Sequence, residues 1–268
     1  MTSTVLDAIV GSARRSAAER AKRVTRATLE REAAARTSRP NALVESLSAP
    51  GVRVIAECKR RSPSRGVLCR QYEPARIAAG YAAAGAAAIS VLTESTFFDG
   101  SLEHLREVTA AVPVPVLRKD FVVSDYQVIE ARAAGAAAVL LIVAALTDRD
   151  LSHLLGAASE YQVEALVEVH SEAEVERALA AGARIVGVNS RDLRTLEMSP
   201  EIFETVGPLI PDEVTMVAES GISTPADLAR LGRMGYDAYL IGERFMTSAD
   251  PGRSLAAFIG EAGNVVAP

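Results

Sequence analysis

The sequence predicts a (β/α)8 barrel preceded by a helical extension, and two observations carry this prediction. Four segments repeat the order helix end, glycine and apolar strand, with the glycines Gly85, Gly135, Gly182 and Gly235 about fifty residues apart. That spacing is close to twice the ~25–30 residues of one unit of strand and helix. Four further apolar runs lie between these segments, so eight strands alternate with helices, as in a closed parallel barrel.

The first part of the chain is expected to form helices that precede the barrel. Apolar side chains recur at helical spacing over residues 4–36, which predicts one or two helices. A further short helix is expected at 42–47, before a Pro-Gly pair that stops it. We therefore assign residues 1–50 to an N-terminal extension and 51–268 to the catalytic barrel, within one domain overall.

The strands and helices of the barrel follow in strict alternation. The strands are expected at residues 52–58, 87–92, 114–118, 137–143, 163–169, 184–188, 214–218 and 238–241. Amphipathic stretches predict helices at 74–84, 102–111, 124–134, 148–160, 171–181 and 224–233. A doubly wound open sheet is the alternative, but it normally carries a glycine-rich dinucleotide turn after its first strand. This chain has the basic stretch 59–66 there instead.

Composition restricts the class of protein. With 268 residues, of which 49% are hydrophobic, the chain can bury a large core. A net charge of −5 disfavours a nucleic-acid partner, although the basic stretch leaves room for a small phosphate site. The two cysteines exclude a disulfide framework and indicate a reducing compartment. No signal peptide or membrane-spanning run is recognisable, so we expect a cytoplasmic protein with no membrane partner.

Polar side chains close seven of the eight expected strands, at the end where barrel enzymes carry their active sites. They are Glu57 and Lys59, Thr93 and Glu94, Lys119 and Asp120, Glu168, Asn189 and Arg191, Glu219 and Ser220, and Gly242 and Glu243. Glu57 and Lys59 lie two residues apart and share one face of the first strand, which turns Cys58 toward the helices. A solvated rim accounts for one or two such residues, but not for this series.

Two further observations concern ligands. Gly221 and Gly242 lie in the loops after the last two strands, where small residues let backbone N–H groups approach a phosphate. His104, His153 and His170 have no partners at metal-ligand spacing, so no metal site is predicted. No Ser-His-Asp or Cys-His nucleophile motif is present either. The sequence therefore favours acid–base chemistry on a phosphorylated small molecule.

A series of motifs resembles the indole-3-glycerol phosphate synthase family, the (β/α)8 enzymes of tryptophan biosynthesis. The motifs are IAECKRRSPS-x-G at 55–66, SVLTE at 90–94, F-x-GS at 98–101, LRKDF at 117–121, LVEVH at 166–170, GVNSRDL at 187–193, AESGI at 218–222 and LIGE at 240–243. They cover nearly the whole chain. Arg61 and the Arg244-Phe245 pair depart from the family pattern, which leaves loop mobility and packing at the phosphate end open.

The resemblance implies ring closure of 1-(2-carboxyphenylamino)-1-deoxyribulose 5-phosphate with loss of CO2 and water, without a cofactor. It implies that Lys119 is the general acid that polarises the substrate carbonyl. Glu57, Lys59 and Glu168 are the candidates for acid and base in the dehydration, and the sequence does not assign which is which. The remaining implied site residues are Asn189, Arg191, Glu219 and Ser220 for the sugar hydroxyls and the carboxylate, Ser62, Gly221, Gly242 and Glu243 for the phosphate, and Phe98 and Phe121 for the aromatic ring.

Three further expectations concern a flap, the quaternary state and two alternative functions. Residues 62–66 are expected to form a mobile flap that carries Ser62 to the phosphate. We expect a monomer or weak homo-oligomer, with association with other tryptophan-pathway enzymes left open. One alternative makes Lys119 the Schiff-base nucleophile of an aldolase-like lyase. Another is a non-catalytic sugar-phosphate-binding subunit, which the full set of polar positions opposes.

Overall fold

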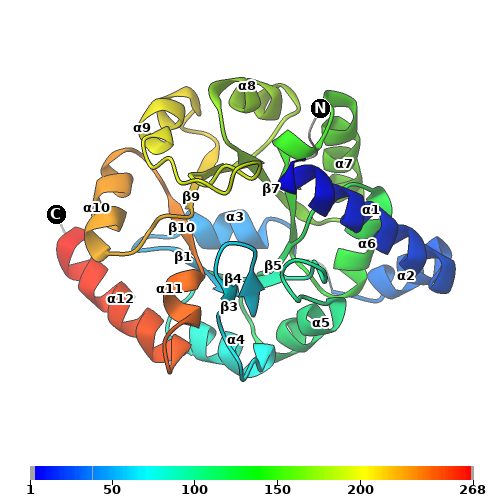
Figure 1. Cartoon of the computed structure of the whole chain (residues 1–268), viewed down its shortest axis with the longest axis horizontal. Helices are drawn as coiled ribbons and strands as arrows, with labels where there is room; N and C mark the ends of the chain where they lie inside the picture. Colours follow the sequence, from blue (N-terminus) through cyan, green and yellow to red (C-terminus); the bar gives the residue numbers. More distant parts are fainter. Residues whose placement is uncertain (1–3, 38, 267–268) are drawn as a thin grey trace.

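Eight parallel strands close into a barrel in the computed structural model, which describes residues 4–37 and 39–266 (Figure 1). The strands are β1 (Val54–Cys58), β4 (Ala88–Leu92), β5 (Val116–Lys119), β6 (Ala138–Ile142), β7 (Glu164–Val169), β8 (Ile185–Asn189), β9 (Thr215–Glu219) and β10 (Ala238–Ile241). β1 pairs with both β4 and β10, which closes the ring. The predicted (β/α)8 TIM barrel is confirmed, and all strands but the last begin one or two residues later than expected.

Helices form an outer ring around the strands (Figure 1). They are α4 (Pro74–Ala83), α5 (Leu102–Ala111), α6 (Asp125–Ala133), α7 (Asp148–Glu160), α8 (Glu172–Ala180), α9 (Ile202–Val206), α10 (Pro225–Arg233) and α12 (Pro251–Val266), with the short helices Val143–Ala145, Gly207–Leu209 and α11 (Glu243–Met246). Sequence reasoning missed α9, α11 and α12. α12 packs against α4, where Gly252 and Gly80 bring the two helices together: a Cβ on Gly252 would lie 3.0 Å from the Gly80 backbone. Tertiary packing therefore stabilises a helix whose glycines oppose it.

The four repeated glycines end helices in the expected way. Gly85, Gly135, Gly182 and Gly235 have φ angles of +91°, +91°, +87° and +93°, in the left-handed region that glycine adopts without steric cost. The turn before β7 is made by Gln162 instead, at φ +54°. The glycine pattern therefore marks only alternate units of the barrel, as its fifty-residue spacing required.

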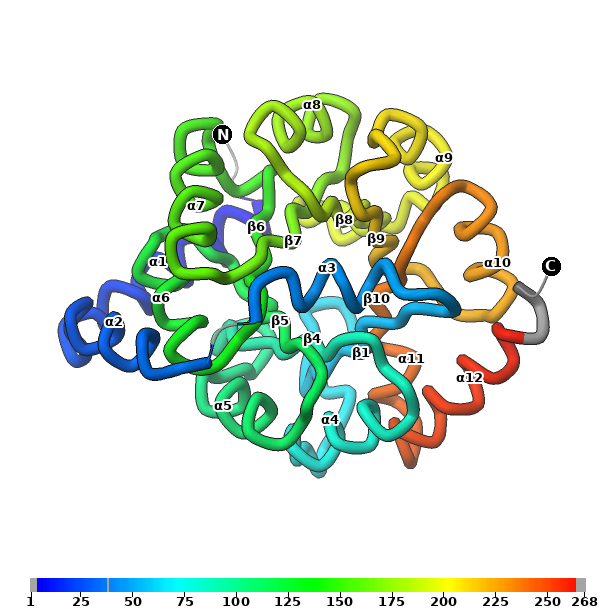
Figure 2. Tube along the Cα trace, turned by 180° about the vertical axis from the view of Figure 1, so that it is seen from behind, coloured from blue at the N-terminus to red at the C-terminus, as the bar shows by residue number. Residues whose placement is uncertain are grey.

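The N-terminal helices cover both ends of the barrel. Helices α1 (Val5–Arg23) and α2 (Arg26–Ala34) confirm the two-helix alternative, and α3 (Ala42–Leu47) has the predicted bounds. Figure 2 shows α3 crossing the amino-terminal end of the strands, where Glu164 accepts hydrogen bonds from the backbone N–H groups of Leu43 and Val44. Leu43 and Leu47 are buried there with the side chains that fill the barrel.

Helix α1 lies at the opposite, carboxyl end of the strands. Its Ser12 hydroxyl lies 2.9 Å from that of Thr96, in the loop after β4. Its Arg20 guanidinium donates two hydrogen bonds, of 2.6 and 2.9 Å, to the carboxylate of Glu130 on α6. Together with α3, this helix integrates the extension with the barrel.

The core has two layers, separated by the strands. Inward-facing side chains such as Ile55, Leu166 and Leu240 fill the barrel, whereas outward-facing ones such as Ala56 and Cys58 pack beneath the helices. This alternation points Glu57 inward, as the sequence predicts. In the part of the chain that the structure describes, no helix is long and apolar enough to cross a bilayer.

Candidate active site

A cavity of about 670 Å³ opens at the carboxyl ends of the strands. All residues to which the family resemblance assigns a role in the site line it: Glu57, Lys59, Ser62, Phe98, Lys119, Phe121, Glu168, Asn189, Arg191, Glu219, Ser220, Gly221, Gly242 and Glu243. Thr93 and Glu94, which also close a strand, do not line it. A cavity of this size suits a small organic ligand. The predicted site residues are therefore brought together, while the role of each stays a prediction.

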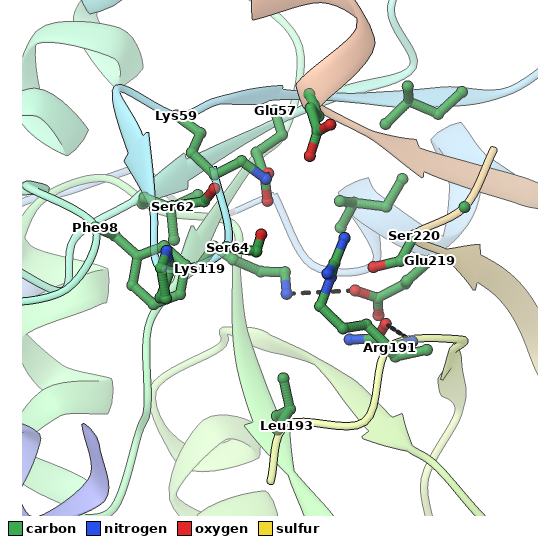
Figure 3. Close-up of a pocket in the computed structure, with 18 of the residues that line it drawn as sticks. Glu57, Lys59, Ser62, Ser64, Phe98, Lys119, Arg191, Leu193, Glu219 and Ser220 are labelled. Atoms are coloured by element: carbon green, nitrogen blue, oxygen red, sulfur yellow. Dashed lines mark hydrogen bonds and ion pairs between the residues drawn. The ribbon is translucent and has the colours of Figure 1, made fainter. Parts of the chain in front are cut away.

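Lys119 lines this cavity at the end of β5. Its Nζ is 3.1 Å from Glu168 Oε2 and 3.3 Å from Glu219 Oε2, and Figure 3 shows its amine directed at Glu219. Burial alone would lower the pKa of Lys119, but the charges of Glu168, Glu219 and Glu57 together raise it. Lys119 is therefore a cation throughout the physiological pH range.

The two carboxyl groups that contact Lys119 differ in charge. The pKa of Glu219 is raised to about 8, mainly by burial. The Lys119 charge offsets only part of this increase, and the Glu168 charge raises the pKa further. Burial also raises the pKa of Glu168, but the charges of Lys119 and His170 outweigh burial and hold that pKa well below its usual range. At neutral pH Glu168 is thus ionised and Glu219 mostly protonated. Within the described residues, Oε1 of Glu219 is buried and accepts no hydrogen bond, whereas Oε1 of Glu168 lies 3.3 Å from Nε2 of His170.

Glu57 and Lys59 form a second acid–base pair, on β1 and just after it. Lys59 Nζ lies 2.5 Å from Glu57 Oε1, and the Glu57 residue is only 4% exposed. Gly242 packs on Glu57 so tightly that a Cβ there would lie 2.5 Å from Oε1 and 2.9 Å from the Glu57 Cβ. Cys58 faces the helices as expected, and burial raises the pKa of its thiol, which makes it a poor nucleophile.

A small hairpin overhangs the cavity, formed by β2 (Arg61–Ser62) and β3 (Gly66–Val67). At its tip Arg65 forms an ion pair of 2.8 Å with Glu243, at the start of α11. Ser62 is buried, lines the cavity and accepts a hydrogen bond from the Arg65 backbone N–H. The expected loop is therefore a hairpin joined by an ion pair to the segment after the neighbouring strand β10; its mobility stays a prediction.

The loops after β8 and β9 present polar groups to the same cavity. Ser220 and Gly221 have φ angles of +65° and +69°, a conformation costly for a serine outside a constrained site. Asn189 accepts a hydrogen bond of 3.0 Å from the backbone N–H of Arg191, and the Arg191 guanidinium donates to the Leu196 carbonyl. Figure 3 shows Arg191 and Ser220 beside Glu219.

An apolar wall faces these polar groups. The rings of Phe98 and Phe121 lie 6.2 Å apart between centroids and are tilted by 33°. Leu140 and Ile142, from the strand that carries no charge at its end, continue the wall. Such a surface suits a planar aromatic group.

Three of the polar residues at the strand ends are engaged in shaping the structure. Glu94 accepts hydrogen bonds from the backbone N–H groups of Thr96, Phe97 and Phe98 and so shapes the loop that carries the Phe98 ring. Thr93 donates to Asp120, which the fully buried Arg118 holds by an ion pair of 2.8 Å. Asp120 therefore stabilises the turn after Lys119.

Several residues near the cavity were not predicted from the sequence. Those on its wall include Ile9, Ser64, Leu140, Ile142, Leu193 and Met198. The sequence does not predict that Ile9 lines the cavity, because nothing in it places α1 at this end of the barrel. His170 was set aside, yet it follows Glu168 by two residues and so belongs to the same face. No group of three or more potential metal-ligating side chains occurs among the residues described.

Comparison with protein families gives one match over nearly the whole chain. The sequence model of the family described as "Indole-3-glycerol phosphate synthase" matches residues 6–258. A protein of that name from Nocardioides sp. (strain ATCC BAA-499 / JS614) is 53% identical over 248 residues, which cover 92% of this chain and 95% of the relative. "Indole-3-glycerol phosphate synthase 1" of Streptomyces coelicolor is 50% identical over 249 residues, 92% of each chain.

Solved structures of lower sequence identity share the fold. The 3-hexulose-6-phosphate synthase from Salmonella typhimurium has a TM-score of 0.62 at 14% identity, covering 80% of this chain and 97% of that one. The thiamine phosphate pyrophosphorylase from Pyrococcus furiosus has a TM-score of 0.60 at 17% identity, over 84% and 100% of the two chains. At such identities the likeness concerns the barrel alone.

Proposed function

The chain belongs to the indole-3-glycerol phosphate synthase family, and from this premise we propose how its side chains divide the work of closing the indole ring. The enzyme is a carboxy-lyase of tryptophan biosynthesis and acts on a phosphorylated small molecule. Its reaction converts 1-(2-carboxyphenylamino)-1-deoxyribulose 5-phosphate into indole-3-glycerol phosphate, CO2 and water.

Lys119 begins the reaction as general acid. The ring carbon that bears the carboxylate attacks the sugar carbonyl carbon, and Lys119 gives its proton to the carbonyl oxygen as the C–C bond forms. The observation that carries this role is the position of Lys119 between Glu168 and Glu219, at 3.1 and 3.3 Å. Glu219, mostly protonated at neutral pH, lies close enough to return a proton to the amine. The carboxylate then leaves as CO2 and its bonding electrons return to the ring.

The dehydration needs one group to protonate the departing hydroxyl and another to remove a proton from the neighbouring carbon. Lys59 is the candidate for the acid, and Glu57 or Glu168 for the base. The 2.5 Å contact between Lys59 and Glu57 supports this division, because it keeps a donor and an acceptor together on one side of the cavity. Glu168, which is ionised at neutral pH, can accept a proton from the other side.

The apolar side of the cavity binds the aromatic ring of the substrate, and the polar side binds its charged and hydroxyl groups. Phe98 and Phe121 pack against the anthranilate ring, since their tilted rings form its apolar wall. Arg191 and Ser220, with Asn189 and Glu219, orient the carboxylate and the sugar hydroxyls. Backbone groups of Gly221, Gly242 and Glu243, with the hydroxyl of Ser62, hold the phosphate. All of these residues line the same cavity.

Four further proposals concern cellular location, oligomeric state, domain organisation and association with other enzymes. A cytoplasmic location is supported by two free thiols, Cys58 and Cys69, which a reducing compartment preserves. A monomer or weak homo-oligomer is supported by the few large apolar side chains that are exposed, among them Val24, Val67 and Leu209. We treat residues 1–50 and 51–268 as one domain, because α1 and α3 pack on both ends of the barrel. Association with other enzymes of the pathway is testable by co-sedimentation.

Mixing the enzyme with the carboxyphenylamino-deoxyribulose phosphate and following indole fluorescence tests this assignment. We expect product to form without added cofactor, and Lys119 to stay unmodified when sodium borohydride is added during turnover. Covalent labelling of Lys119 by the reduced substrate would support the Schiff-base lyase instead. Tight binding of the substrate without turnover would support the non-catalytic alternative.

A further inference from the structure

His170 lies outside the cavity lining, in the turn between β7 and α8. Its Nε2 is 3.3 Å from Glu168 Oε1, on the side of that carboxylate opposite to Lys119. The His170 side chain is 12% exposed and the Glu168 side chain only 1%. Glu168 is thus held between two basic groups from different parts of the barrel.

The imidazole is itself fixed by Glu174, on the first turn of α8. Glu174 Oε2 accepts a hydrogen bond of 2.8 Å from the His170 backbone N–H and lies 3.3 Å from Nδ1 of the ring. One carboxylate therefore fixes both the backbone and the ring of His170. Because Nδ1 faces Glu174, Nε2 is directed at Glu168.

We propose that His170 is a positioning residue, which holds the Glu168 carboxylate in one orientation and keeps it ionised for the proton transfers at the substrate. The inference rests on the proposed role of Glu168. His170 does not line the cavity, so it acts through Glu168 rather than on the substrate.

The charges around the pair support this role. Burial would lower the pKa of His170, but its contacts with Glu168 and Glu174 raise it to about 10, so the ring is cationic at neutral pH. Glu168 faces Lys119 on β5 and His170 beyond its own strand, while Glu219 on β9 competes for the Lys119 amine. A second cation lets Glu168 stay charged even when Lys119 turns to the substrate or gives up its proton.

Replacing His170 with glutamine tests the inference by the pH profile of kcat. His170→Gln removes the charge but keeps a hydrogen-bond donor. We expect the acidic limb of the profile to move up by about one pH unit, because a nearby cation lowers a carboxyl pKa by roughly one to three units. Because a neutral amide attracts the Glu168 carboxylate less strongly than an imidazolium, we expect kcat at pH 7.5 to fall about tenfold, the factor that corresponds to one pKa unit. KM should stay within about twofold, and His170→Lys should return the limb toward the wild-type position.

A second variant and one control keep the test decisive. Glu174→Gln keeps a hydrogen-bond acceptor for His170 but removes the negative charge of Glu174 beside the ring. This variant should also lower kcat, and it provides a test even if His170→Gln folds poorly. His153→Gln, on the exposed face of α7, should leave the profile unchanged. A kcat within about twofold of wild type and an unmoved acidic limb in His170→Gln would overturn the inference.

Glu168→Gln separates this inference from the role on which it rests. Normal kcat in Glu168→Gln would refute the catalytic role of Glu168 itself. A large loss in Glu168→Gln beside an unaffected His170→Gln would refute only the positioning role. If both hold, adding His170→Gln to Glu168→Gln should lower kcat by no more than about twofold further, because the two residues act as one unit.

Discussion

Replacing Lys119 with methionine removes the amine while keeping most of the aliphatic stem. A general acid typically contributes roughly 10²–10⁴ in rate. With Lys119 in contact with both Glu168 and Glu219, we expect kcat to fall by that factor, about 3–5.5 kcal/mol of barrier. Indole fluorescence on adding the carboxyphenylamino-deoxyribulose phosphate measures the loss, and turnover within about tenfold of wild type would refute the acid role.

The same substitution has a consequence for stability that depends on pH. Without Lys119, the pKa of Glu219 rises further above both its present value of about 8 and the value of an unfolded glutamate. A group whose folded-state pKa is raised stabilises the fold at low pH and loses that contribution as pH increases. Lys119→Met should lower Tm already near pH 6, because it breaks the buried ion pair with Glu168. The deficit should grow above pH 8, where wild-type Glu219 ionises beside Lys119 and the Glu219 of the variant does not. A wild-type pKa of about 8 limits this growth to about 1.4 kcal/mol at pH 9, or about 2–5 °C in Tm. A deficit independent of pH would contradict these charge assignments.

Three further substitutions test other parts of the site. Glu57→Gln should lower kcat by roughly 10²-fold or more with little change in KM, and an effect confined to KM would reassign Glu57 to positioning. Gly242→Ala should lower kcat severalfold, because the new Cβ displaces the Glu57 carboxylate; Gly260→Ala, where a Cβ meets nothing within 4 Å, is the matched control and should be silent. Arg20→Met should lower Tm by about 2–6 °C and kcat/KM severalfold, since two hydrogen bonds to Glu130 hold α1 near the cavity. Lys22→Met, which breaks an exposed pair on the same helix, should leave both unchanged.

The barrel and most of its wall could be predicted because local signals agree with the fold. Each parallel strand is buried on both faces and reads as an apolar run, so a polar residue at its end stands out against that background. The glycines at helix ends mark where alternate units close, and their left-handed φ angles explain why glycine recurs there. Lys119 and Glu168 could be found in this way although 49 residues separate them in sequence.

What the sequence did not reveal depends on contacts between distant segments. α12 has an amphipathic face, but its glycines make sense only against Gly80 of α4. Glu94 and Lys119 are alike as charged residues at strand ends, yet backbone N–H groups surround Glu94 and carboxylates surround Lys119. The position of α1 over the cavity follows from its contacts with Thr96 and Glu130, which no periodicity encodes.

The charge on Lys119 decides between the two chemistries, because a general acid requires an ammonium and a Schiff-base nucleophile requires a free amine. Nuclear magnetic resonance of enzyme with isotope-labelled lysine side chains, assigned with Lys119→Met, measures that charge directly. We expect the Lys119 signal to stay that of an ammonium to pH 10, since Glu168, Glu219 and Glu57 raise its pKa. A Lys119 signal that titrates near pH 7 to 8, as in amines activated for covalent catalysis, would contradict it.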